Sequence, residues 1–323
     1  MSDYELSLLH VILNDLQLNP AYYSCSNESQ TVSVKSPFLG GYFLVSGCLF
    51  ITLYLICLFS ILSSERIKTS SYKIMTVLAV YDIISLSANS VATGYFAING
   101  LTFCENRLLF FIFGAFALGS WLGSCVTSIT LAVNRCCDLN PHAHLWLLFE
   151  GKRIYVFMAV FVVYGLYGTF LSKPVIFHSQ FMSWFFDPLV GTDPTLYSNF
   201  LHSANNIVVS IVTIALYIYI CITIISQSHF GTSVKFSNTQ KQIILQSVLI
   251  CFCHTFATFI YVYMQFFPAP LFLILMAQFG WQFCNSSMCF IYLTVNRSVR
   301  NSVFGMFCSK FAQQQASVSH LSH

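Results

Sequence analysis

A single acidic side chain stands in the middle of one of the long apolar stretches of this sequence. Asp82 is the only charged residue between Lys73 and Glu105, an interval of 31 residues. A charge at mid-membrane depth costs about 2.5–3.5 kcal/mol on insertion scales unless it is paired or hydrated. Asp82 therefore predicts a functional polar cluster, and Ser124 and Asn285 lie at compatible depths in two other apolar stretches to be its partners.

Other residues with catalytic or metal-binding chemistry are sparse inside the apolar stretches. His254 is the only histidine well inside one, and His202 lies near a boundary, whereas an intramembrane zinc hydrolase needs several ligands at one depth. No apolar stretch contains the lysine that a retinal Schiff base needs, and we expect most of the 13 cysteines to be apolar filler. We therefore expect no catalytic residue, no metal site and no cofactor, and hence no enzyme.

The composition of the whole chain shows what kind of element must hold these residues. Charged residues make up 8% of the 323 residues, apolar residues make up 56%, and the mean hydropathy is +0.71, whereas soluble domains carry about 25% charged residues. So few charges cannot cover a water-soluble surface, and a net charge of +3 cannot neutralise a nucleic-acid backbone. The composition excludes a soluble enzyme, a disordered chain and a nucleic-acid binder, and it predicts an integral membrane protein.

The charge-free runs set the number of membrane spans. A helix needs about 20 apolar residues to cross the hydrocarbon core. Five runs each fit one helix, and a longer run from Lys241 to Arg297 is divided into two by Pro268 and Pro270. The predicted fold class is all-α, an integral membrane bundle of seven transmembrane helices. The expected helices cover about residues 40–62, 74–98, 107–136, 152–171, 202–226, 240–266 and 271–294.

The basic residues in the loops predict the orientation of this bundle. With the N-terminus outside, only Lys35, Arg107 and Lys173 lie on the outer side, and eleven basic residues lie in the inner loops and tail. Such an excess is typical of the cytoplasmic side. Residues 1–36 then form an extracellular tail, and the seven-helix bundle takes up 37–296.

The two ends of the chain carry further predictions. The first 30 residues lack the basic region of a cleaved signal peptide. Among three Asn-x-Ser sequons, only the one at Asn27 lies outside, so Asn27 is the expected glycosylation site. After the last span we expect an amphipathic, membrane-parallel helix over 297–309 and a cytoplasmic tail over 310–323.

Several short motifs resemble those of rhodopsin-like G-protein-coupled receptors. The segment Leu-Ala-Val-Tyr-Asp82 is similar to that family's second-helix motif, and Ser124 matches a serine that shares the pocket of its aspartate. The segment Leu-Ala-Val-Asn134-Arg135 resembles Asp-Arg-Tyr at the end of the third helix, and Tyr292 looks like the end of Asn-Pro-x-x-Tyr. The resemblance implies a rhodopsin-like architecture, a conformational switch at Asp82, Ser124, Asn285 and Tyr292, and G-protein coupling at Asn134 and Arg135.

The sequence departs from that family at its usual locks and hinges. Asn134 cannot form the usual acid–arginine pair with Arg135. Residues 239–243, at the inner end of the expected sixth helix, contain no acid that could pair with Arg135 across the helices. Helices five, six and seven also lack a proline kink. We therefore expect the inactive state to be held by other contacts.

A closer resemblance is to the nematode serpentine chemoreceptors of class T, and it extends over about residues 25 to 305. It includes the segments Ser71-Tyr-Lys-Ile-Met75, Gly100-Leu-Thr-Phe-Cys104, Ser183-Trp-Phe-Phe-Asp-Pro188, Tyr261-Val-Tyr-Met-Gln-Phe266 and Gly280-Trp-Gln282. The resemblance implies a chemosensory receptor that couples to a heterotrimeric G protein. It also implies a location in the plasma membrane of sensory neurons.

A ligand pocket is expected in the outer halves of helices three, six and seven. These segments are rich in aromatic and amide side chains and hold no acid, so a neutral, largely apolar small molecule is a better ligand than a cationic amine. About half of these aromatics could instead face lipid. Trp184, Phe185 and Phe186 could form either a ligand lid or an interfacial anchor. The predicted ligand-binding residues are Phe110, Phe111, Phe113, Trp184, Tyr261, Tyr263, Gln278, Trp281 and Gln282.

A disulfide is expected in a place that differs from the rhodopsin-like plan. In that plan a cysteine near helix three pairs with one in the second outer loop, but residues 172–206 contain no cysteine. Cys104 still lies on the outer side, where Cys25 in the tail is the other clearly extracellular cysteine. We predict the bridge Cys25–Cys104.

A seven-helix ligand-gated channel or transporter is the alternative function. Transporters usually show repeated halves and broken helices, whereas this sequence has no evident repeat and its eight prolines lie in tails, loops or turns. A channel of the insect odorant-receptor type would have its N-terminus inside. Orientation therefore discriminates between the receptor and the channel.

Overall fold

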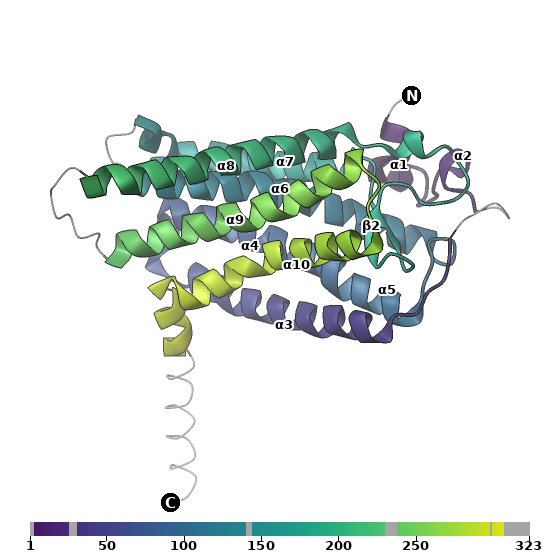
Figure 1. Cartoon of the computed structure of the whole chain (residues 1–323), viewed down its shortest axis with the longest axis horizontal. Helices are drawn as coiled ribbons and strands as arrows, with labels where there is room; N and C mark the ends of the chain where they lie inside the picture. The colour runs from purple at the N-terminus through teal and green to yellow at the C-terminus, as the bar shows by residue number, and fades with distance from the viewer. Residues whose placement is uncertain (1–2, 26–30, 140–143, 230–237, 298, 307–323) are drawn as a thin grey trace, which may run out of the picture.

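The computed structural model describes residues 3–25, 31–139, 144–229, 238–297 and 299–306. In this part of the chain, long helices run side by side along one axis (Figure 1). The π-helical segment η3 (Ser87–Ala92) joins two helices into one span, so seven helical spans make up the described bundle. The helices are α3 (Pro37–Leu62), α4 (Ser70–Leu86), α5 (Thr93–Asn99), α6 (Arg107–Leu139), α7 (Arg153–Phe170), α8 (Phe200–His229), α9 (Asn238–Phe266) and α10 (Leu271–Thr294).

The spans have the length and composition of membrane helices. Among the described residues, α3, the continuous rod from α4 to α5, α6, α7 and α8 are each long and apolar enough to cross a bilayer. In α9 the apolar part is shorter, Cys251–Met264. The helix α10 contains the polar residues Gln278, Gln282 and Asn285, and all three are buried.

The helix α6 forms the centre of the bundle. Of its most apolar window, 72% of the residues are buried, against 22% for α8. It packs against α4, α7, α8 and α9. A Cβ atom at Gly119 would lie 1.8 Å from Thr169 Oγ1 of α7, so only glycine permits this close approach of α6 and α7.

The π-helical segment η3 binds the last span through polar contacts. Gln278 Nε2 donates to the carbonyl oxygen of Asn89 at 2.8 Å, and Gln282 Nε2 donates to Ser90 Oγ at 3.0 Å. Wide π-helical turns are rare and are often found at functional sites. The contacts of Gln278 and Gln282 join the last span to this segment of the second span.

One end of the bundle is covered by short elements from distant parts of the sequence. The segments η1 (Asp3–Leu6), α1 (Leu8–Leu13) and α2 (Pro20–Tyr23) lie there with the hairpin strand β2 (Figure 1). The antiparallel hairpin consists of β1 (Ile176–His178) and β2 (Ser183–Phe185), with Phe177 opposite Trp184. All its residues except Phe185 are buried. We call this the N-terminal end.

The opposite end of the bundle holds the loops η2 (Glu65–Lys68) and η4 (His144–Phe149). Residues 299–306 are helical, with Val299 and Val303 buried and Phe304 61% exposed. Residues 307–309 of the expected amphipathic helix, and the tail 310–323, lie outside the described residues. The lipid contact of this segment stays a prediction.

Candidate functional site

A cavity opens at the N-terminal end of the bundle and is bordered by the hairpin. Its volume is about 670 Å³, including the mouth. Side chains from α6, α8, α9 and α10 form its walls, and β2 with the residue after it contributes three aromatic rings. We call it the tryptophan cavity, lined by Ala117, Leu118, Trp121, Val175, Trp184, Phe185, Phe186, His202, Tyr261, Met264 and Trp281.

Aromatic rings from three helices, α6, α9 and α10, meet around Trp121. The ring centroid of Trp121 lies 6.2 Å from that of Tyr261, 6.3 Å from that of Trp281 and 6.2 Å from that of His254. Edge-to-face and offset arrangements at such distances are favourable for aromatic pairs. The described lining includes no acid, lysine or arginine. The cavity is therefore suited to a neutral molecule with a large apolar surface.

The three tryptophans of the cavity differ in how their indole N–H groups are satisfied. Trp121 Nε1 donates to Asn206 Oδ1 at 2.9 Å, and Trp184 Nε1 donates to Thr93 Oγ1 at 2.8 Å. Trp281 Nε1 is buried and has no hydrogen-bond partner among the described residues. The indole N–H groups of Trp121 and Trp184 are thus hydrogen-bonded within the protein, whereas that of Trp281 remains an unused donor.

A buried polar cluster lies deeper in the bundle, between α3, α4, α6 and α10. The hydroxyl of Tyr54 lies 2.7 Å from Asp82 Oδ2, and Asp82 Oδ1 accepts a hydrogen bond from Ser124 Oγ at 3.2 Å. The same Tyr54 hydroxyl lies 2.5 Å from the backbone carbonyl oxygen of Asn285. We call these four residues the Asp82 cluster. All are at most 1% exposed, so the carboxyl depends on these partners.

The sequence matches the family described as serpentine type 7TM GPCR chemoreceptor Srt over residues 6–316. The chain belongs to this Srt family. A curated relative, "Serpentine receptor class T-55" of Caenorhabditis elegans, is 25% identical over 312 residues, which cover 93% of this chain and 85% of the relative. The resemblance seen in the sequence is thereby confirmed. The protein is a seven-transmembrane chemosensory receptor, and its family is a class of receptors, not of enzymes.

Three of the ligand-binding residues predicted for this Srt receptor line the tryptophan cavity. They are Trp184, Tyr261 and Trp281. Phe185 and Phe186, which with Trp184 make up the predicted lid or interfacial anchor, also line it. Sequence reasoning missed Trp121 and His202, although Trp121 lies three residues before Ser124 and thus on the same side of α6. That spacing was the available signal for Trp121.

The other predicted ligand-binding residues lie elsewhere, and packing explains each position. Phe110 and Phe113 contact the ring of Phe96, and Phe111 contacts Tyr23, so these rings fill the core of the N-terminal end. Tyr263 is 39% exposed and stacks on Phe267, so it lies on the outside of α9. The amides of Gln278 and Gln282 bind η3 instead of facing the cavity.

The predicted switch residues of the receptor are brought together in part. Asp82 and Ser124 are in direct contact, but Asn285 joins them through its backbone carbonyl. Its side-chain Nδ2 donates to the carbonyl oxygen of Trp281 at 2.9 Å, which connects the Asp82 cluster to the floor of the cavity. The Tyr292 hydroxyl is buried without a hydrogen-bond partner among the described residues. Tyr54, which sequence reasoning missed, carries no motif that would single it out.

At the opposite end of the receptor, Asn134 and Arg135 both contact α4. Asn134 Oδ1 accepts a hydrogen bond from Ser71 Oγ at 2.5 Å. Arg135 Nη2 lies 3.6 Å from the sulfur of Met75. Rhodopsin-like receptors have an acid–arginine pair at this position. Here Asn134 and Arg135 instead contact Ser71 and Met75 of α4.

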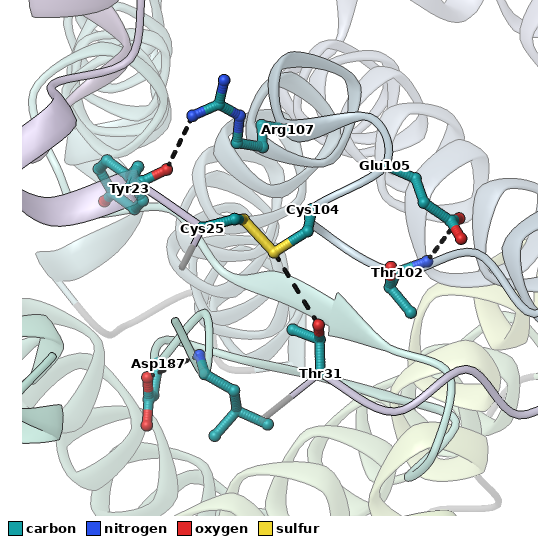
Figure 2. Close-up of a disulfide and its surroundings, with 9 residues drawn as sticks. Tyr23, Cys25, Thr31, Thr102, Cys104, Glu105, Arg107 and Asp187 are labelled. Carbon is teal, nitrogen blue, oxygen red and sulfur yellow. Dashed lines mark hydrogen bonds between the residues drawn. A yellow bond between two sulfur atoms is a disulfide. The ribbon is translucent and has the colours of Figure 1, made fainter. Parts of the chain in front are cut away.

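The predicted disulfide of the receptor is present. Cys25 and Cys104 are bonded, with their Cα atoms 5.8 Å apart (Figure 2). Beside the bridge, Arg107 Nη1 donates to the carbonyl oxygen of Tyr23 at 3.2 Å. Lys173 forms an ion pair with Asp3 at 3.1 Å. The N-terminal segment is thus held covalently and by two cations. Asn27 lies outside the described residues, and its glycosylation stays a prediction.

Proposed function

We propose that this receptor binds a small, neutral, largely apolar molecule in the tryptophan cavity and activates a heterotrimeric G protein at the opposite end. The supporting observation is the cavity itself, which combines three tryptophans with a lining free of acids and basic chains among the described residues. A cationic amine would find no counter-ion there. The expected ligand-contacting residues are Trp184, Tyr261 and Trp281, with Trp121 at the centre.

The proposed signal travels through contacts between the cavity and the Asp82 cluster. Trp121 of α6 meets His254 of α9 and Trp281 of α10, and the backbone of Trp281 accepts a hydrogen bond from Asn285. A ligand that contacts these three helices can favour one arrangement of them over another, because it stabilises the arrangement that it binds more tightly. An agonist would favour the state in which α9 stands away from α6.

The proposed coupling surface lies at the opposite end, around Asn134 and Arg135. Separation of α9 from α6 there would open a groove for the C-terminal helix of a Gα subunit, a common mode of helix recognition. The hydrogen bond between Ser71 and Asn134 joins α4 to α6 in the present state. We propose that this contact helps to hold the inactive arrangement.

The proposed orientation places the N-terminus outside, in the plasma membrane of sensory neurons. The loop charges and the family support this orientation, and the disulfide at the N-terminal end fits an oxidising compartment. A glycan on Asn27 would support it further. An N-terminus inside the cell would instead favour the channel or transporter alternative.

The decisive experiment measures ligand-evoked second messengers in cells that express the receptor with a set of Gα subunits. A panel of neutral apolar compounds and of amines of matched size is applied. We expect neutral agonists, and Tyr261→Ala should raise their half-maximal concentration about tenfold or more because a buried aromatic contact is lost. Tyr263→Ala, two residues away on the outer surface, is the matched control and should leave potency unchanged. Amine agonists, or full potency in Tyr261→Ala, would contradict the proposal.

A further inference from the structure

The unused donor in the tryptophan cavity restricts the chemistry of the ligand. Trp281 is 5% exposed, lines the cavity, and its Nε1–H has no hydrogen-bond partner among the described residues. An indole N–H donates only. Buried polar groups are nearly always satisfied, and the cavity that Trp281 lines is where a bound molecule could bring an acceptor to this donor.

The neighbouring tryptophans show that this feature is particular to Trp281. Trp121 and Trp184 line the same cavity and are buried to the same degree, with 3% and 5% of their surfaces exposed. Their N–H groups are satisfied by Asn206 and Thr93. The protein thus uses side-chain oxygens as acceptors for the other two indoles, yet no described side chain accepts a hydrogen bond from Trp281.

We infer that the ligand of this receptor is a neutral compound with one hydrogen-bond acceptor oxygen, such as a ketone, aldehyde or ester, and that this oxygen binds Trp281 Nε1–H. The inference deepens the proposed function and rests on the tryptophan cavity being the ligand site. A carboxylate does not fit, because the described lining contains no lysine or arginine to balance its charge. A plain hydrocarbon fits the apolar walls but leaves the donor unsatisfied.

The discriminating probes are pairs of compounds with the same shape that differ only in the acceptor. Acetophenone is compared with α-methylstyrene, and cyclooctanone with methylenecyclooctane, because each alkene replaces the carbonyl oxygen by a methylene group. Binding to the purified full-length receptor is followed by tryptophan emission, since three of the four tryptophans line the cavity. We expect each ketone to bind about tenfold more tightly than its alkene, which corresponds to one hydrogen bond.

Two variants assign this preference to one indole. Trp281→Phe keeps an aromatic ring without the N–H, and the ketone-to-alkene ratio of affinities should fall to about one. Trp121→Phe is the matched control, because the N–H that it removes is already used by Asn206, and the ratio should be retained even if both affinities change.

A measurement on the unmodified receptor tests the inference even if the variants do not fold. With 15N-labelled tryptophan, the four indole N–H groups give separate signals, and acetophenone should move the signal of Trp281 downfield while α-methylstyrene should not. Equal binding of both members of each pair to the unmodified receptor overturns the acceptor inference and leaves the cavity as a ligand site. Failure of all four probes to bind overturns both the inference and the proposed site.

Discussion

At the scale of single residues, the hydroxyl of Tyr54 contacts two acceptors although it has one proton. It lies 2.7 Å from Asp82 Oδ2 and 2.5 Å from the carbonyl oxygen of Asn285. Both contacts are satisfied when Asp82 carries a proton and donates it to Tyr54, while Tyr54 donates to Asn285. The arrangement thus fits a neutral side chain at position 82, and ionisation would require these partners to rearrange.

Replacement of Asp82 by asparagine tests this interpretation. The Asp82→Asn side chain supplies an amide donor in place of the acid proton and cannot ionise, so the receptor should reach the cell surface at its normal level. Its half-maximal agonist concentration should change by about fivefold or more, the usual scale of coupling between sites. The measurement is a concentration–response curve with surface labelling. Ser286→Ala is the control, because that hydroxyl donates to the carbonyl oxygen of Phe283 in the same helix. An unchanged curve for Asp82→Asn would refute a switching role.

At the scale of elements, the hairpin of β1 and β2 contains a buried histidine that is hydrogen-bonded to the segment directly after β2. His178 Nε2 donates to the carbonyl oxygen of Asp187 at 2.8 Å, and His178 is 6% exposed. Burial disfavours the charged imidazolium and lowers the pKa of His178 to about 4. The imidazole of His178 is therefore neutral at neutral pH, and the folded hairpin requires this neutral form.

This lowered pKa predicts that acid destabilises the hairpin. In the unfolded chain a histidine has a pKa of about 6.5, so between pH 6.5 and 4 the unfolded state binds a proton that the folded state does not. The contribution of His178 to the free energy of unfolding is complete above pH 6.5 and should fall by about 2 kcal/mol between pH 7 and 5. Thermal unfolding of the purified receptor at constant ionic strength measures this loss. His178→Gln keeps an N–H donor and should show a shallower decline, whereas parallel curves would count against the assignment.

At the scale of the whole molecule, the bridge between Cys25 and Cys104 closes a loop that contains the first two spans. The two cysteines are 79 residues apart in the sequence. The chain-entropy model gives about 4–5 kcal/mol for a loop of this length. The N-terminal segment is thereby kept over the end of the bundle that holds the tryptophan cavity.

Single and double replacements of these cysteines test both the bridge and the proposed orientation. Cys25→Ser, Cys104→Ser and the double variant should lower the unfolding temperature by similar amounts, because each removes the same bond. In intact cells, a membrane-impermeant thiol reagent should label Cys104 in the Cys25→Ser receptor but not in the unmodified receptor. Cys48, exposed on α3, is replaced by serine in all forms as a control. Labelling of Cys104 in the unmodified receptor would contradict the bridge, and no labelling in Cys25→Ser would contradict an outer N-terminal end.

The sequence by itself determined the membrane class, the family, the partner of Cys25 and the contact between Asp82 and Ser124. These features depend on composition, on the order of motifs and on which charges and cysteines the chain contains, and all of these are visible in the sequence without knowledge of the packing. A membrane helix must be apolar over about 20 residues whatever its neighbours are. The spans could therefore be located without any knowledge of how they pack.

Only the tertiary structure decided which side chains face the tryptophan cavity. Tyr261 lines it and Tyr263 faces outward, although both are aromatic residues of the same predicted helix. In a soluble helix the buried and exposed faces differ in polarity, but in a bilayer both the core face and the lipid face are apolar. The rotation of each helix therefore leaves little trace in the sequence. The contributions of Trp121 and Tyr54, and the unused N–H of Trp281, follow from packing between helices that are distant in the chain.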